Sequence, residues 1–179
     1  MNKLLDYFCD LRNLALFVAG MSILALGSAL VMQYGFNILP CHMCYLQRKP
    51  YWATIALGIA GLLVAKKSPR ATFVMILLAV AAFMANIGMS AFHIGVENSW
   101  WKPLEGCGGE GATVPEGLTI EELKEWYKNR PIIDCRVPGF VLFGISLTGY
   151  NFLFSTFMAG FTLINAIQGY KRVKTASKT

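Results

Sequence analysis

Charge is scarce in this sequence and is absent from long stretches of it. Only 15% of its 179 residues are charged and 55% are hydrophobic, whereas a soluble domain usually carries about 25% charged residues. No charged residue occurs in the segments 13–47, 50–65, 71–96 and 137–170. Because about 20 apolar residues are enough for a transmembrane helix, these gaps exclude an ordinary soluble protein and predict an integral membrane protein.

The sequence also lacks internal repeats, low-complexity segments and nucleic-acid-binding motifs, so no nucleic-acid partner is expected. No small-residue cleavage site follows its first apolar stretch, and two acidic residues, Asp6 and Asp10, precede that stretch. We therefore expect the first apolar segment to be a retained helix and not a cleaved signal peptide.

Four membrane spans are predicted in a single domain covering residues 1–179, at about 14–33, 46–65, 71–92 and 139–166. The expected fold class is an all-α membrane protein, a four-helix transmembrane bundle in the lipid bilayer. The uncharged part of the second span covers only about 24 Å, against a hydrocarbon core of ~30 Å, and Pro50 is expected to start its regular helix or to kink it. Small and polar residues inside the spans are interpreted as helix-packing positions: Asn86, Asn151, Asn165, Gly58, Gly61, Gly144 and Gly149.

Lysine and arginine are distributed unevenly between the segments that join the spans. The N-terminus, the 66–70 turn and the C-terminal tail together carry nine basic and two acidic residues, whereas 34–50 and 93–138 carry seven basic and eight acidic residues. By the positive-inside rule, we expect both termini and the 66–70 turn in the cytoplasm. The loops 34–45 and 93–138 should then lie on the outer side of the membrane.

This orientation divides the five cysteines: Cys41, Cys44, Cys107 and Cys135 lie outside and Cys9 lies inside. An even number of thiols in an oxidising compartment is typical of disulfide chemistry, whereas Cys9 should stay reduced. A disulfide between Cys107 and Cys135 would restrict the loop. If it acts through loop entropy, it would stabilise the folded protein by about 3–4 kcal/mol. Alternatively, the glycine-rich surroundings of Cys107 would leave it accessible to a partner thiol.

The second outer loop also contains a predicted short amphipathic helix. Thr119 and Glu122 form a capping box, and Pro131 ends the helical pattern. An apolar face is shared by Ile120, Leu123, Trp126 and Tyr127. We expect this helix to lie on the membrane surface; the alternative is that it packs against the other loop.

The Cys41-x-x-Cys44 pair permits a redox, a metal-binding or an incidental interpretation. A redox dithiol needs one thiol with a lowered pKa, which a helix beginning near Cys41 would favour through its unpaired amides. Arg48 and Lys49 add positive charge, and Arg48 shares a helical face with Cys44. A cation beside a thiolate at the membrane boundary suits an electron acceptor dissolved in lipid; the alternative for Arg48 is a contact with lipid headgroups.

No metal site is expected. Zinc needs four ligands, which the outer cysteines with His42 and His93 could supply. However, Cys107 and Cys135 do not form a second closely spaced pair, and an oxidising compartment disfavours free thiolates. Haem attachment requires histidine at position 45, which is Tyr45.

The whole pattern resembles the DsbB family of bacterial disulfide-bond formation proteins. The likeness is carried by the four spans, two loop cysteines and three motifs: "PCHMCYLQRKPY" at the second span, "HIGVENSWW" at the end of the third and "DCRVPGFVLFGISLTGYN" entering the fourth. It extends over roughly residues 14–166, is strongest at 40–51 and 134–151, and is weak between 101 and 133 apart from Cys107.

The resemblance implies a thiol:quinone oxidoreductase of the bacterial inner membrane whose active cysteines face the periplasm. Cys107 and Cys135 would exchange with a DsbA-type thioredoxin-fold protein, with Cys107 forming the mixed disulfide. The electrons would pass to the Cys41–Cys44 pair, and the Cys44 thiolate would deliver them to ubiquinone or menaquinone.

Two further positions match the family pattern. Arg48 matches an arginine beside the quinone, and His93 lies where the family has a histidine near the quinone. The alternative for His93 is an interfacial histidine whose hydrogen bonds are satisfied. At position 47 the best-known members carry an acidic residue, and this sequence has Gln47. The two residues between the cysteines, His42 and Met43, also differ from theirs. Both differences bear on the redox potential of the cysteine pair.

Three other functions stay open at this point. The chain could be a non-enzymatic membrane protein whose outer disulfides brace its loops, or a DsbB-like oxidase for one dedicated thiol partner. A quinone reductase of the vitamin K epoxide reductase type is less favoured, because that family places its active pair in the last core helix and this pair opens the second span.

Overall fold

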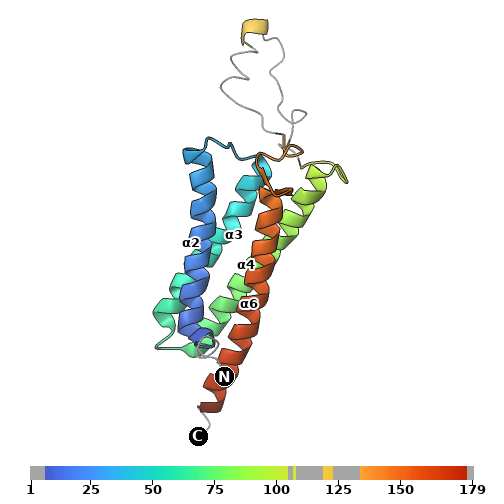
Figure 1. The fold of residues 1–179 in the computed structure, drawn as a ribbon. Helices are drawn as coiled ribbons and strands as arrows, with labels where there is room; N and C mark the ends of the chain where they lie inside the picture. Colours follow the sequence, from blue (N-terminus) through green and yellow to red (C-terminus); the bar gives the residue numbers. More distant parts are fainter. Residues whose placement is uncertain (1–6, 105–106, 108–118, 123–133, 177–179) are drawn as a thin grey trace.

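The computed structural model describes residues 7–104, 107, 119–122 and 134–176. Four long helices make up most of this part of the chain: α2 (Leu11–Gly35), α3 (His42–Val64), α4 (Pro69–Glu97) and α6 (Leu147–Ala176). They lie side by side, with α4 packed against α3 and α6, and α2 packed against α3 (Figure 1). The start of α2, the α3–α4 turn and the end of α6 lie at one end of the bundle, and the start of α3 lies at the other.

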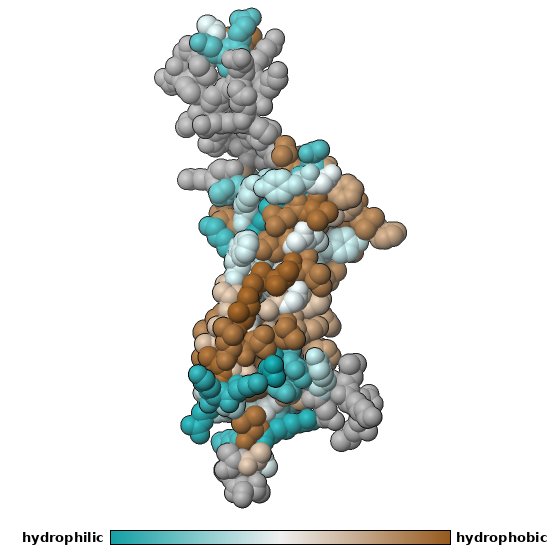
Figure 2. All heavy atoms as spheres, turned by 90° about the vertical axis from the view of Figure 1, so that its left-hand side faces the viewer, coloured by the Kyte–Doolittle hydropathy of each residue, from teal (hydrophilic) through white to brown (hydrophobic). Residues whose placement is uncertain are grey.

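Three of these helices, α2, α4 and α6, are long and apolar enough to cross a membrane. On the face shown in Figure 2, hydrophobic side chains cover the middle of the bundle, and hydrophilic side chains gather toward the end where α2 begins. Helix α3 is not among the three, because its first turns carry Gln47, Arg48 and Lys49 and its apolar part begins only at Pro50. The chain is therefore a helical multi-pass membrane protein, and a fourth span through α3 stays a prediction.

Local sequence signals explain where the helices begin. Asp10, Cys41 and Ser68 are the N-caps of α2, α3 and α4, and each side chain accepts a hydrogen bond from a backbone N–H of the first turn. Such contacts satisfy amides that have no partner inside the helix. Pro69 follows Ser68 at the first helical position, where proline is favoured. Pro50 does not start α3 but lies inside it.

The predicted start of the fourth span at residue 139 is wrong. Helix α6 begins at Leu147, and the preceding residues form an antiparallel hairpin of β1 (Val141–Leu142) and β2 (Ile145–Ser146). Its two turn residues, Phe143 and Gly144, have φ of 49° and 78°, and a tight two-residue turn of this kind requires positive φ at both positions. Gly144 is therefore a turn residue and not a helix-packing position, and the described chain is not purely helical.

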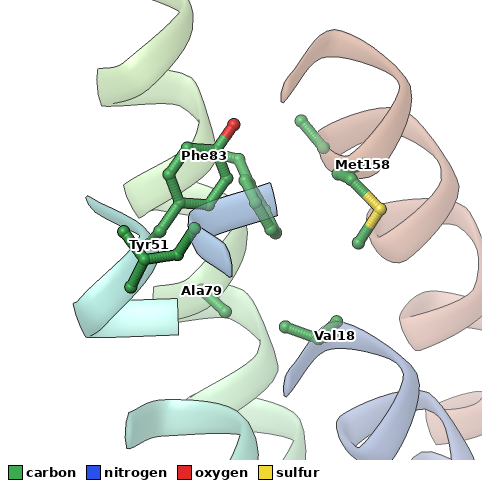
Figure 3. Close-up of a cluster of buried hydrophobic side chains, with 7 residues drawn as sticks. Val18, Tyr51, Ala79, Phe83 and Met158 are labelled. Atoms are coloured by element: carbon green, nitrogen blue, oxygen red, sulfur yellow. The ribbon is translucent and has the colours of Figure 1, made fainter. Parts of the chain in front are cut away.

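The four helices share a buried apolar core. Val18 of α2, Tyr51 of α3, Phe83 of α4 and Met158 of α6 face one another (Figure 3). Ala79 completes the group, and Phe83 and Met158 have no exposed surface. Residues from all four helices thus hold together the part of the bundle that supports the site described next.

The predicted capping box in the outer loop is confirmed. The backbone N–H and the hydroxyl of Thr119 donate to Glu122 Oε2 at 2.9 and 2.8 Å, and the Glu122 N–H donates back to Thr119 Oγ1 at 3.4 Å. The remainder of the predicted amphipathic helix, from residue 123 onward, lies outside the described residues.

Candidate redox site

The Cys41–Cys44 pair lies at the first turn of α3. The Cys44 N–H donates to Cys41 Sγ at 3.3 Å, and the two sulfur atoms are 2.8 Å apart. Nε2 of His93, on α4, lies 3.7 Å from Cys41 Sγ. The hydrogen bond from the Cys44 thiol is the largest cause lowering the pKa of Cys41 to about 4, His93 acts in the same direction, and burial opposes both. The pair can therefore hold the thiolate that redox exchange requires.

The other two predicted site cysteines form a disulfide that packs beside this pair. Cys107 and Cys135 are bonded and lie in one buried cluster with Cys41, Met43 and Val96. The prediction that Cys107 is accessible is wrong for this structure: only 4% of it is exposed, because the disulfide packs into that cluster. The fold thus brings all four predicted site cysteines together, although 107 and 135 are far from 41 and 44 in sequence.

A cavity of about 450 Å³ borders the cysteine pair. Its lining comes from α2, α3, α4, α6 and the segments 38–40 and 137–140, and includes Cys41, Cys44, Arg48 and His93. Most of the other lining residues are apolar, among them leucine, isoleucine, valine and phenylalanine. Its size and composition are typical of a site for a small, largely apolar ligand.

Arg48 is held in the wall of this cavity by α2. Its Nη1 donates to Gln33 Oε1 at 2.6 Å, and its Nη2 donates to the Ala29 carbonyl oxygen at 3.4 Å. The guanidinium carbon lies 5.0 Å from the centre of the Tyr45 ring, within the range of a cation–π interaction. These contacts hold the charge beside the cavity and favour a ligand contact over a headgroup contact alone.

His93 is 2% exposed and has polar neighbours on both sides of its ring. Its Nδ1 lies 2.9 Å from Gln47 Nε2 and 3.2 Å from Thr148 Oγ1. Asn151 Nδ2 donates to Gln47 Oε1 at 2.8 Å, which leaves the Gln47 nitrogen facing the ring. His93 is thus a hydrogen-bonded buried histidine, and it also faces the Cys41 sulfur.

Three polar residues of this site are not among those predicted from the sequence: Glu97, Thr148 and Asn151. Asn151, interpreted above as a helix-packing position, also donates to Ser90 Oγ at 2.9 Å. Glu97 had a detectable signal, because it is the only charged residue between positions 70 and 102 and follows His93 by one helical turn. Thr148 and Asn151 reach the site from α6, and no spacing within α6 indicates this.

The site also contains a group of atoms that could bind a metal ion. One donor atom from each of Cys41, Cys44 and His93 lies within 4.8 Å of the others. Structural zinc is almost always held by four protein ligands, and this group supplies three. The arrangement fits a redox pair with a neighbouring base at least as well, and the absence of a metal stays a prediction.

Comparisons with known proteins identify a family. The chain matches the sequence model of "Disulfide bond formation protein DsbB" over residues 11–165. It is also 30% identical over 142 residues to "Uncharacterized protein RP370" of Rickettsia prowazekii (strain Madrid E), an alignment that covers 79% of this chain and 80% of that protein. No solved structure matches the chain.

Proposed function

We propose, from the premise that this chain belongs to the DsbB family of disulfide bond formation proteins, that it reoxidises a periplasmic DsbA-type dithiol oxidase and passes the electrons to a membrane quinone. Family membership supports the coarser statement, a membrane oxidoreductase of disulfide-bond formation. The finer statement is supported chiefly by one observation: the two cysteine pairs share a buried cluster, and one pair borders an apolar cavity.

In the proposed reaction, Cys107, which is 4% exposed in this structure, must first become accessible to the partner. A thiolate of the reduced DsbA-type protein then attacks Cys107 and displaces Cys135. The second thiol of the partner then resolves the mixed disulfide, so the partner leaves oxidised and Cys107 and Cys135 are left as a dithiol. A second exchange reduces the Cys41–Cys44 disulfide and restores the Cys107–Cys135 bond. In each cycle two electrons and two protons pass from the partner to the Cys41–Cys44 pair. The second exchange needs no long movement, because the two cysteine pairs pack in one cluster.

The cavity has features that suit a quinone. Its apolar walls fit a ring and the start of an isoprenoid tail, and Arg48 and His93 provide polar groups for the carbonyl oxygens. When bound, ubiquinone or menaquinone would supply a two-electron, two-proton acceptor. Cys44 would transfer the electrons, because it lines the cavity one helical turn before Arg48. The thiolate expected on Cys44 is favoured on Cys41 instead, since the hydrogen bond with Cys41 and burial raise the pKa of Cys44. In this proposal the site faces the periplasm, and both termini lie on the cytoplasmic side of the inner membrane.

The proposal is tested by following quinone reduction by absorbance, with the purified full-length protein and a reduced DsbA-type protein as electron donor. The wild type should turn over with ubiquinone or menaquinone, and Cys44→Ser should abolish turnover while keeping the fold. Cys9→Ser is the matched control, because Cys9 lies at the opposite end of the bundle, beside Asn165 and Gln168.

Well-folded wild-type protein that reduces neither quinone would contradict the proposal. The remaining functions would then be a dedicated thiol partner or a non-enzymatic role. In the non-enzymatic case, Cys44→Ser should lower the thermal stability and change no reaction.

A further inference from the structure

Glu97 is a partly buried carboxylic acid that the proposed electron route does not use. It ends α4, its side chain is 10% exposed, and it lines the same cavity as the cysteine pair. Its Oε1 accepts a hydrogen bond from the Thr148 hydroxyl at 2.7 Å, and its Oε2 accepts one from the Ser146 hydroxyl at 2.6 Å. Burying a carboxyl group costs free energy unless it is hydrogen-bonded, and here both oxygens have a donor.

A continuous line of hydrogen-bonding atoms joins Cys41 to Glu97. Cys41 Sγ lies 3.7 Å from His93 Nε2, His93 Nδ1 lies 3.2 Å from Thr148 Oγ1, and Thr148 Oγ1 lies 2.7 Å from Glu97 Oε1. The Thr148 hydroxyl donates to Glu97, so its lone pairs are free to accept from an Nδ1–H of His93. Each atom on the line can therefore pass a proton to the next.

Both tautomers of His93 have partners in this structure. With the hydrogen on Nδ1, the ring donates to Thr148 and its bare Nε2 faces the Cys41 thiol. With the hydrogen on Nε2, Nδ1 accepts from Gln47 Nε2 at 2.9 Å and the Nε2–H faces a Cys41 thiolate. The Gln47 Nε2–H groups face Nδ1 at 2.9 Å, so the tautomer with the hydrogen on Nδ1 requires the Gln47 side chain to turn away from the ring, and the change of tautomer is coupled to that movement.

We propose that this line carries a proton and that Glu97 stores it. His93 Nε2 takes the proton of the Cys41 thiol while the Nδ1 proton moves to the Thr148 hydroxyl, whose own proton moves to Glu97 Oε1. The products are a Cys41 thiolate, a neutral His93 in its other tautomer and a protonated Glu97. His93 is then the base for the thiol, and Thr148 and Glu97 act through it.

The inference rests on the proposed function, and its atoms and electrons balance. The two thiols of Cys41 and Cys44 lose two electrons and two protons and become a disulfide, and a quinone that gains both becomes a quinol. One proton reaches the quinone from Glu97, which returns to its ionised form. The other comes from Cys44, whose side chain also lines the cavity.

The other ionisable groups around the cavity leave Glu97 as the proton store. Besides the pair and His93, α3 contributes Arg48 and Tyr51, α6 contributes Tyr150, and α2 contributes none to the described lining. Glu97 is the only carboxylate of that lining, and Arg48 is its only permanent cation. Arg48 can balance the thiolate charge but cannot take up a proton near neutral pH.

Infrared difference spectroscopy on the full-length protein in lipid nanodiscs, without quinone, tests the inference directly. Reduction of the Cys41–Cys44 pair should produce the C=O stretching band of a protonated carboxylic acid. Glu97→Gln should abolish this band. Thr148→Val should also abolish it, because valine has nearly the shape of threonine but lacks the hydroxyl that links His93 to Glu97. Thr148→Ser should restore it. Glu122→Gln, in the exposed capping box, is the matched control and should keep the band.

Single-turnover quinone reduction provides the second readout. General acid–base groups typically contribute about 10²–10⁴-fold in rate, so Glu97→Gln and Thr148→Val should each slow proton-coupled quinone reduction by about 10²-fold or more. Glu122→Gln should match the wild type in both measurements.

The possible results separate this inference from the proposed function. Suppose that the wild type shows the reduction-linked band, that Glu97→Gln loses it, and that the wild type reduces no quinone. This result would support the proton path and overturn the proposed function. Quinone turnover with no carboxylic acid band, or with a band that persists in Glu97→Gln, would overturn the proton path. Bands of equal intensity in Thr148→Val and Thr148→Ser would also overturn the proton path, because the Thr148 hydroxyl would then transfer no proton.

Discussion

Cys41 combines a structural and a chemical role in one sulfur atom. Helix N-caps are usually Ser, Thr, Asp or Asn, whose oxygen accepts a hydrogen bond from the first turn. Here Cys41 Sγ accepts that bond from the Cys44 N–H at 3.3 Å. The same contact that caps α3 therefore stabilises negative charge on the sulfur, together with the positive end of the helix dipole. A substitution at this residue should affect both the helix start and the chemistry.

We expect the reduced, quinone-free protein to keep a thiolate far into acidic solution. Because the pKa of Cys41 is lowered to about 4, its thiolate should be present above that pH and should disappear only as the pH falls through about 4. The measurement is the ultraviolet absorbance of the thiolate during a pH titration, with Cys41→Ser as the control. A signal that vanishes near the pKa of a free thiol, about 8.5, would contradict the lowered pKa.

Arg48 should govern quinone affinity. Its guanidinium spans Gln33 and the Ala29 carbonyl, an arrangement that the single ammonium group of lysine cannot reproduce. Hydrogen bonds to charged groups contribute about 1.5–3 kcal/mol, so Arg48→Gln should raise the KM for quinone by about tenfold or more. Arg48→Lys should raise it less.

The matched control for Arg48 is Lys102→Gln, which removes an exposed cation outside the cavity lining. It should leave the KM for quinone unchanged. An Arg48→Gln variant with an unchanged KM and a lowered rate of thiol exchange would place the role of Arg48 in the cysteine chemistry instead.

At the scale of elements, α2 and α3 approach closely at Gly58. A Cβ added there would lie 2.9 Å from Ala19 Cβ and 3.0 Å from the Ala15 carbonyl oxygen, so alanine at this position requires the two helices to move apart. Gly58 is thus a helix-packing residue, as its place inside a span predicts. Gly20, on α2, has nothing within 4 Å of an added Cβ.

Replacing each of these two glycines with alanine should change the stability of the protein in opposite directions. Gly58→Ala should destabilise the protein by about 1–3 kcal/mol through overpacking. Gly20→Ala should be neutral or stabilising by up to about 1 kcal/mol, because alanine favours the helix. Thermal unfolding of both variants in the same detergent measures the difference. An equal shift of Tm in the two variants would show that α2 and α3 are not tightly packed at Gly58.

Gaps between charged residues predicted the approximate segments of the helices, because a helix that spans a membrane excludes charge; the bounds of the membrane spans stay predictions. The gaps could not locate the start of α6, since residues 139–146 are as apolar as a helix and only the Phe143-Gly144 turn separates them from it. Spacing and family resemblance also selected the cysteines, Arg48 and His93, and the structure brings them together, while their roles stay predictions. Thr148 was not selected, because it contacts His93 across helices, and such contacts leave no periodic signal in the sequence.

The whole molecule has two different ends. One holds the start of α2, the end of α6 and the 66–70 turn, where most basic residues of the described part of the chain lie, and the other holds both cysteine pairs and the cavity. By the positive-inside rule, the end with more basic residues is predicted to face the cytoplasm. Electrons would then enter from the periplasmic side and leave sideways into the bilayer.

Such electron flow requires the disulfides to be unusually oxidising or to be pulled forward by the quinone step. Structural disulfides have potentials below about −300 mV and DsbA is near −120 mV, so a structural disulfide would oxidise DsbA uphill by about 180 mV, or roughly 8 kcal/mol. We therefore expect both pairs well above about −300 mV. The Cys41–Cys44 pair should owe this to its thiolate, which stabilises the reduced form.

Equilibration of quinone-free protein in thiol–disulfide buffers, followed by quantification of free thiols, measures both potentials. The double variants Cys41→Ser/Cys44→Ser and Cys107→Ser/Cys135→Ser each leave one outer pair and assign the two values separately. His93→Gln should lower the potential of the Cys41–Cys44 pair, because it removes a group that stabilises the thiolate. Values below about −300 mV for both pairs would mean that the disulfides brace the loops and would contradict the oxidase function.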